Sequence, residues 1–248
     1  MLEDTILKNG ESLDDLILGD LKIIQARKGY RFSLDALLLA HFCSTDGVRD
    51  VFDFGTGSGI IPIILTFRAP ELKITGIDLQ AQMVERARRS VKLNNLQDKI
   101  GILEQDIKKL EEVFSKGLAD LVVCNPPFYK KGEGQLSSNS EAAIARHELE
   151  LTLGEIIKQA SYILKDRGKI ALIQRASRLT EVISLFTDYK IKTSRIRMVH
   201  TKLDSEAKLC LIEGQKHGRL PLEILAPLII YQADGQYSEE IKKWYQKT

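Results

Sequence analysis

The sequence predicts an α/β fold built on a mostly parallel sheet with helices on both faces. Strand-like and helical apolar segments alternate from about residue 49 to residue 190, which is typical of repeated βαβ units. Polar residues and glycines follow several of these strands, at the edge where ligands bind in open α/β sheets. The length of 248 residues suits one domain of this class.

The first predicted element is a short hairpin within residues 13–26, where Gly19-Asp20 separates two apolar segments. A helix is predicted over 34–42, because Ser33 can cap it and Asp35 lies in its first turn, where a carboxylate suits the helix dipole. Strands are then predicted at 49–54, 73–78, 100–104, 119–124, 168–174, 190–200 and 207–213, and helices at 59–68, 80–94, 153–164 and 178–187.

Length and composition indicate a single globular domain over residues 1–248, with 1–45 as an N-terminal extension and 46–248 as the core that carries the motifs described below. The chain is 44% hydrophobic and 28% charged, and its apolar stretches are too short to cross a membrane. No signal peptide is expected, and the three isolated cysteines (Cys43, Cys124 and Cys210) are expected to be reduced in a cytoplasmic protein. The four histidines show no metal-ligand spacing, so no metal site is expected.

The most informative motif is Asn125-Pro126-Pro127-Phe128, which directly follows the strand at 119–124. The two prolines stop the strand and stiffen the backbone at its carboxyl end. The Asn125 side-chain oxygen and the Pro126 carbonyl can both accept hydrogen bonds from one planar amino group, and Phe128 offers a face for stacking. A proline turn with a buried phenylalanine is the alternative when the motif is taken alone.

A glycine-rich loop lies upstream, between the strand at 49–54 and the helix at 59–68. Gly55, Gly57 and Gly59 occur at alternate positions after Asp53, and glycine allows a ligand to approach the backbone closely. The spacing differs from the nicotinamide fingerprint and from the phosphate-binding loop. Taken alone, the loop is also compatible with a structural turn.

Acidic residues end the next two strands. Asp78 lies 19 positions after Gly59, a spacing similar to that at which a carboxylate binds ribose hydroxyls, and Leu79 can pack on an adenine. Asp106 and Ile107 follow the strand at 100–104, where a carboxylate can accept the adenine amino group. For Asp106 alone, a helix cap is the alternative.

These motifs, in this order, resemble the class I S-adenosylmethionine-dependent methyltransferases, and specifically the branch with Asn/Asp-Pro-Pro-Phe/Tyr that methylates planar nitrogens. Segments 32–40, 145–148 and 234–238 are similar to the tRNA1(Val) adenine-37 N6-methyltransferase family. The resemblance implies a Rossmann-like sheet of seven strands closed by an antiparallel pair. It also implies that Asp53 holds the methionine amino end of the cofactor, with Asp35 near that end.

The resemblance further implies methyl transfer from S-adenosylmethionine to an exocyclic amine of RNA, with S-adenosylhomocysteine as the product. Adenine N6 in a tRNA anticodon loop is the expected target. Three other functions stay open: methylation of a protein glutamine, methylation of guanine N2 in ribosomal RNA, and a silent cofactor-binding RNA module. A duplicated half is absent, and only a few dozen residues precede Asp53, which argues against the first two.

The charge distribution indicates a polyanionic partner for the carboxyl-terminal half. Residues 1–124 carry 16 Lys/Arg and 19 Asp/Glu, whereas residues 125–248 carry 20 and 15. A polar segment at 129–151 is interpreted as a lid or, alternatively, a surface insertion. The expected RNA contacts are Tyr129, Lys130, Lys131, Arg146, Arg195 and Arg197, although a solvated surface is the alternative for such charges. A monomer is expected.

Overall fold

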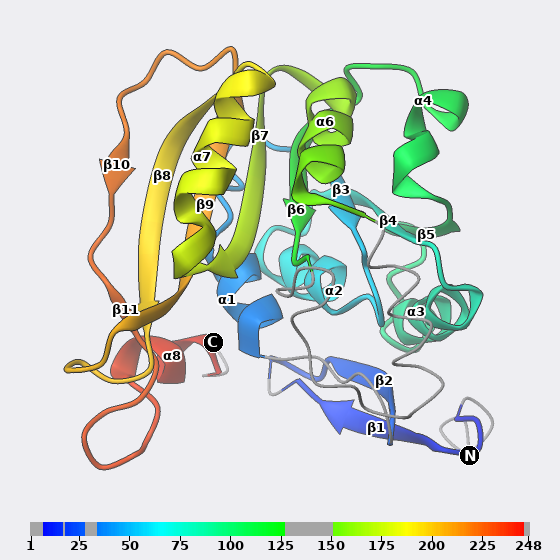
Figure 1. The fold of residues 1–248 in the computed structure, drawn as a ribbon. Helices are drawn as coiled ribbons and strands as arrows, with labels where there is room; N and C mark the ends of the chain where they lie inside the picture. Colours follow the sequence, from blue (N-terminus) through cyan, green and yellow to red (C-terminus); the bar gives the residue numbers. More distant parts are fainter. Residues whose placement is uncertain (1–6, 17, 28–33, 127–150, 246–248) are drawn as a thin grey trace.

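The computed structural model describes residues 7–16, 18–27, 34–126 and 151–245 (Figure 1). Its centre is a sheet whose longer strands lie in the order β8-β9-β7-β6-β3-β4-β5. These strands are β3 (Asp50–Phe54), β4 (Lys73–Asp78), β5 (Ile100–Glu104), β6 (Ala119–Cys124), β7 (Leu164–Arg175), β8 (Ile191–His200) and β9 (Ala207–Lys216). β9 runs antiparallel to both of its neighbours, β7 and β8, whereas the other neighbouring pairs among these strands are parallel. The predicted mostly parallel sheet of seven strands, closed by an antiparallel pair, is confirmed.

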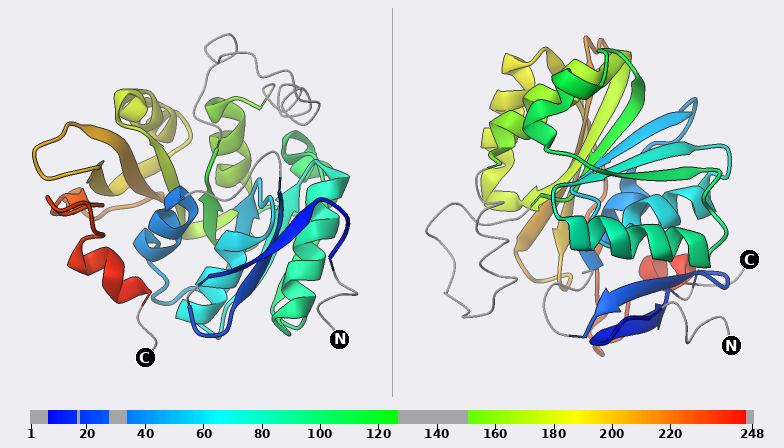
Figure 2. Two further views of the ribbon diagram at one scale, coloured as in Figure 1. Left: turned by 90° about the horizontal axis from the view of Figure 1, so that it is seen from below. Right: turned by 90° about the vertical axis from the view of Figure 1, so that its right-hand side faces the viewer.

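Helices cover both faces of the sheet, as predicted (Figure 2). On one face lie α1 (Leu34–Phe42), α2 (Ile60–Arg68) and α3 (Ala81–Leu93), and on the other lie α6 (Leu153–Ile163), α7 (Leu179–Asp188) and the short α4 (Leu110–Val113). Strand residues alternate between the two faces. In β6, for example, Leu121 and Val123 join the first core, whereas Val122 joins the second. This is the period of two expected of a strand buried on both faces.

The structure adds several short elements that the sequence did not predict. Two strands of two residues each, β10 (Glu223–Ile224) and β11 (Leu228–Ile229), pair with the outer edge of β8. The turns η1 (Ile107–Lys109) and η2 (Ala176–Arg178) and the helix α8 (Glu239–Trp244) are also new. Elements this short contain too few residues to show an apolar period.

The predicted N-terminal hairpin is confirmed, as β1 (Glu11–Asp15) pairs antiparallel with β2 (Lys22–Ala26). Leu16, Leu18 and Ile23 join the core that contains α2 and α3, so the hairpin covers these helices on the side away from the sheet (Figure 2). This position explains why α2 is apolar around its whole circumference. The division into an extension and a catalytic core stays a prediction.

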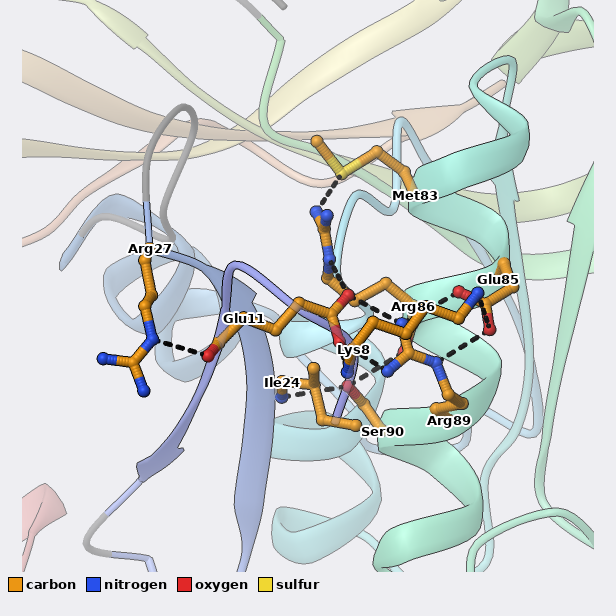
Figure 3. A network of polar contacts seen from close by, with 9 residues as sticks. All are labelled: Lys8, Glu11, Ile24, Arg27, Met83, Glu85, Arg86, Arg89 and Ser90. Carbon is orange, nitrogen blue, oxygen red and sulfur yellow. Dashed lines mark hydrogen bonds and ion pairs between the residues drawn. The ribbon is translucent and has the colours of Figure 1, made fainter. Parts of the chain in front are cut away.

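A buried carboxylate fastens the hairpin to α3 (Figure 3). Glu11 is only 7% exposed, and its oxygens accept hydrogen bonds from Arg86 at 3.1 Å and from Arg89 at 2.6 and 2.7 Å. Two backbone contacts extend the attachment along α3: the Ile24 N–H donates to the Ser90 hydroxyl, and the Lys22 N–H donates to the Asn94 side chain. The hairpin therefore holds α3 at several points along its length.

Candidate functional site

The predicted motifs meet at one edge of the sheet. β5, β4, β3 and β6 are consecutive neighbours, and all four are parallel, so their carboxyl ends lie side by side. Asp53 of β3 pairs with Gly76 of β4 on one side and with Val123 of β6 on the other. The glycine loop, the acidic end of β4 and the Asn125-Pro126 step therefore leave the sheet from adjacent strands.

The glycine loop adopts backbone conformations that favour glycine. The φ angles of Gly55, Gly57 and Gly59 are 72°, 56° and 84°, in the left-handed region. A Cβ at Gly55 or Gly57 would meet no described atom within 4 Å, whereas one at Gly59 would lie 3.4 Å from the Ala87 Cβ of α3. The first two glycines thus border open space that suits a ligand, and Gly59 allows α2 and α3 to pack closely. Cofactor binding by Gly55, Gly57 and Gly59 stays a prediction.

Asp78 ties the glycine loop to the start of α3. One of its carboxylate oxygens accepts from the Gly57 N–H at 2.7 Å and the other from the Gln80 N–H at 3.0 Å. Burial raises the pKa of Asp78 above its ordinary value, and the two backbone donors reduce this rise without cancelling it. Each oxygen keeps a further lone pair that can accept a ribose hydroxyl. The next side chain, Leu79, is 51% exposed, as expected of a side chain that packs on a planar ligand.

Replacing Asp78 by alanine is expected to weaken S-adenosylmethionine binding by about 1–3 kcal/mol, because hydrogen bonds to a charged group are removed. Isothermal titration calorimetry measures the loss. The Asp78→Asn variant is the control, since it keeps one acceptor oxygen for the loop. Equal affinities for wild type and Asp78→Ala would contradict the assignment of Asp78 to the cofactor.

Asp53 is a buried carboxylate without a hydrogen-bond partner among the described residues. Burial raises its pKa to about 7, and the nearby charge of Asp78 adds to the rise. The nearby Thr56 hydroxyl lowers the pKa of Asp53 and so opposes this rise, although Thr56 and Asp53 do not form a complete hydrogen bond. Thr56, whose hydroxyl is also buried and unpartnered within the described chain, is a residue that the sequence pattern did not single out. An unpaired carboxylate at this position fits the ammonium group of a cofactor's methionine end.

Cofactor binding is expected to depend on pH through Asp53. The pKa of about 7 means that the carboxyl group is mostly neutral at pH 6 and mostly ionised at pH 8. Because only the ionised form attracts an ammonium group, affinity for S-adenosylhomocysteine should rise about fivefold to tenfold over this range, with release of a proton. Titrations at several pH values test this. An unchanged pH profile in Asp53→Asn would contradict the role of Asp53.

Asp106 caps the turn η1, which was the alternative left open for it. Its side chain accepts a hydrogen bond from the Lys108 N–H at 2.9 Å. Ile107 is buried in the second core. Asp106 nevertheless follows the carboxyl end of β5. The last residue of β5, Glu104, pairs with Asp78 of β4, so Asp106 and Asp78 lie at the same edge of the sheet. Contacts of Asp106 and Ile107 with an adenine stay a prediction.

Only the first half of the Asn-Pro-Pro-Phe motif lies within the described residues. Asn125 is half-buried and Pro126 buried, directly after the last residue of β6. Cys124, the preceding residue, pairs with Phe54, so Asn125 lies beside the start of the glycine loop. The other predicted residues of this region lie outside the described residues: Pro127, Phe128, Tyr129, Lys130, Lys131 and Arg146, together with most of the 129–151 segment.

The two arginines predicted to contact RNA both form ion pairs. The guanidinium of Arg197 makes two hydrogen bonds to Glu240 of α8, at 2.6 and 2.7 Å. Arg195 lies 3.7 Å from the buried Glu213 and 3.8 Å from Glu223. Their charges are therefore largely balanced within the protein, which weakens the interpretation that they bind phosphates. Their assignment to RNA stays a prediction.

Metal-binding and membrane-spanning features are both missing from residues 7–16, 18–27, 34–126 and 151–245. Within these ranges, no three His, Cys, Asp or Glu side chains are grouped to hold a metal ion, and no helix is both long and apolar enough to cross a bilayer. Cys43, Cys124 and Cys210 are all buried and free.

Sequence comparison relates the chain to known methyltransferases. A family model described as methyltransferase small domain matches residues 34–195. The tRNA1(Val) (adenine(37)-N6)-methyltransferase of Porphyromonas gingivalis strain W83 is 31% identical over 220 residues, which cover 85% of each chain. The Aeromonas hydrophila protein of the same name is 26% identical over 215 residues, or 86% of this chain and 87% of that one.

Solved structures share the fold. A predicted O-methyltransferase from Agrobacterium tumefaciens superposes with a TM-score of 0.68 at 22% identity, over 85% of this chain and 95% of that one. A SAM-dependent methyltransferase from Aquifex aeolicus gives 0.52 at 18% identity, over 73% and 88%. At these identities the likeness concerns the fold alone.

Proposed function

The chain belongs to the methyltransferase small domain family and is an S-adenosylmethionine-dependent methyltransferase, and from this premise we propose that it methylates adenine N6 in a tRNA anticodon loop. The relatives that are similar over most of the chain are named for this reaction. The observation that carries the proposal is the position of Asn125 and Pro126 at the carboxyl end of β6, beside the glycine loop.

The described residues fit the cofactor. Asp53 supplies an unpaired buried carboxylate, Asp78 supplies acceptor oxygens, and Gly55 and Gly57 leave open space beside the backbone. When bound, S-adenosylmethionine supplies an electrophilic methyl group on a sulfonium. The chain's own contribution is to hold this group beside the β6 end, from which the substrate amine is presented.

Asn125 acts on the amine through hydrogen bonding. The lone pair of an aromatic amine is delocalised into its ring, so the amine is a weak nucleophile. Acceptance of its two N–H bonds by the Asn125 side-chain oxygen and the Pro126 carbonyl favours a pyramidal nitrogen whose lone pair points away from the ring. Positioning and electrostatic stabilisation of this kind need no strong base. The target base must leave its stack to reach these acceptors, which favours an unpaired loop.

The proposed substrate is tested with the purified protein and tritiated S-adenosylmethionine. Unmodified tRNA, ribosomal RNA and release factors are offered separately, and labelled products are identified by mass spectrometry of nucleosides and peptides. N6-methyladenosine in tRNA is expected. N2-methylguanosine in RNA, or methylglutamine in a release factor, would replace the proposal with the corresponding alternative. A tRNA substrate also implies a cytoplasmic enzyme, and we propose that it acts as a monomer.

A further inference from the structure

Basic side chains gather at the edge of the sheet opposite to the cofactor motifs. This amino-edge basic surface consists of Lys116, Arg167, Lys190, Lys192, Lys216 and Arg219. They come from the segment before β6, the amino end of β7, the turn between α7 and β8, the amino end of β8, and the end of β9 with the segment that follows it. Figure 1 shows these chain segments at one end of the sheet, with the hairpin and α1 toward the other.

Backbone and side-chain contacts join these segments into one surface. The His217 N–H donates to the Lys190 carbonyl at 2.8 Å, and the Lys192 ammonium donates to the Arg219 carbonyl at 3.2 Å. Gln215 of β9 makes a third contact: its side-chain N–H donates to the Arg167 carbonyl at 3.0 Å. The segments that carry all of these basic residues except Lys116 are therefore fixed relative to one another.

The positive charge of this surface is not balanced by the protein. Of the six cations, only Arg167 forms an ion pair within the described residues, with Asp166 at 3.9 Å, and His217 also contacts that carboxylate at 2.7 Å. The Lys216 ammonium donates to the Ser161 and Leu164 carbonyls. Among the described residues, Lys190, Lys192 and Arg219 form no ion pair. By contrast, Lys165 at the same edge is neutralised by Asp50 and Asp120.

The backbone at this surface is unusual. Four non-glycine residues of the described chain have positive φ angles, and three of them lie here: Arg167 (64°), Lys190 (58°) and His217 (50°). Glycine or asparagine relieves the strain of this conformation, whereas a long basic residue does not. Two of these three positions, Arg167 and Lys190, are long basic residues of the amino-edge basic surface.

We propose that the amino-edge basic surface binds the phosphate backbone of the RNA substrate, away from the nucleotide that is methylated; this rests on the proposed function. Uncompensated cations held in a fixed array suit a polyanion, and phosphate contacts fix its position without reading sequence. β6 runs from this edge to the catalytic edge in six residues, or about 20 Å, and β7 beside it carries a bulge between Leu164 and Lys169. Helices α6 and α7 cover one face of the sheet between the two edges, so an RNA that contacts both edges must run around the protein surface and extend beyond an anticodon loop.

The test compares Lys190→Gln/Lys192→Gln/Arg219→Gln with a control that removes the same charge elsewhere. Lys73→Gln/Lys92→Gln/Lys99→Gln serves, because Lys73 and Lys99 lie at the amino ends of β4 and β5 and Lys92 in the last turn of α3. These positions are at the same edge but at the opposite end of the strand order from β8. For full-length tRNA, the first variant should raise KM at least tenfold and flatten the dependence of log Kd on log salt by about one unit for each phosphate that is no longer neutralised. Its KM for an isolated anticodon stem-loop and its Kd for S-adenosylmethionine should be unchanged.

Equal losses in the two triple variants, or equal losses on full-length tRNA and the stem-loop, would overturn the proposal. The same conclusion follows if tRNA affinity is unaffected. Filter binding of unmodified tRNA reports on the surface even where no methyl group is transferred. A wild-type protein that binds tRNA through these residues but methylates a different substrate would therefore contradict the proposed function alone.

Discussion

Replacing Asn125 by alanine is expected to lower kcat by about 100-fold or more while S-adenosylmethionine binding stays nearly intact. The reason is that the Asn125 side-chain oxygen orients the amine most strongly in the transition state, when its lone pair forms the new bond. Removal of an interaction made only there lowers kcat and kcat/KM together. Single-turnover kinetics with saturating tRNA isolates the chemical step.

The Asn125→Asp variant is the matched control, because it keeps an acceptor oxygen at the same reach. It should retain more activity than Asn125→Ala. Full turnover by the alanine variant would mean that Asn125 only forms the turn after β6. A large loss of cofactor affinity would instead indicate that it supports the neighbouring glycine loop.

Replacing Glu11 by glutamine is expected to lower the free energy of unfolding by about 3 kcal/mol. The change leaves Arg86, which is 8% exposed, without a carboxylate, and an uncompensated buried charge is costly. Arg89 loses its hydrogen bonds to Glu11 but keeps Glu85 at 2.8 Å. Urea unfolding monitored by circular dichroism gives the loss. Lys165→Gln is the control, since that ion pair with Asp50 and Asp120 is more exposed and should cost less than about 1 kcal/mol.

The same network predicts an acid transition. Burial alone would raise the pKa of Glu11, but hydrogen bonds from Arg89, the Lys8 N–H and Arg86 lower it to about 2. Because the folded-state pKa is below the unfolded value of about 4.5, the stabilisation is complete above that value and is lost as pH falls toward 2. Glu11→Gln should show less loss of stability across this window; an identical acid dependence would exclude Glu11 as its source.

The sequence predicted the elements that are long enough to show an apolar pattern, and it missed very short elements and contacts between distant segments. Inner strands such as β3, β4 and β6 were predicted because each is a mainly apolar segment that leads into a polar residue or glycine. Capping by Asp106 was an alternative because an isolated Asp after a strand usually caps a helix. The two-residue strands beside β8 were missed because two residues show no period. The all-round apolarity of α2 was visible in the sequence, but not that a hairpin more than 30 residues upstream covers it.

The sequence predicted which motifs form the site and in which order they occur, but it did not predict which carboxylates pair with the basic residues. Motifs at successive strand ends meet in space whenever the sheet is parallel, which placed Asp53, Asp78 and Asn125 together. The partners of the basic residues are remote in sequence: Arg197 is held by Glu240, 43 residues away. A charge count over residues 125–248 therefore grouped the neutralised arginines of β8 with the uncompensated lysines at its amino end.

The position of β9 has a consequence for protein synthesis. β8 pairs with β9, β10 and β11, all of which follow it in the chain. A nascent chain that has just released residue 200 from the ribosome therefore contains Asp53, Asp78 and Asn125 but has no partner for β8, and the outer edge of β7 is still open. An open edge invites pairing with other chains, so ribosomal stalling or premature termination between residues 200 and 216 should produce fragments that aggregate or require chaperones.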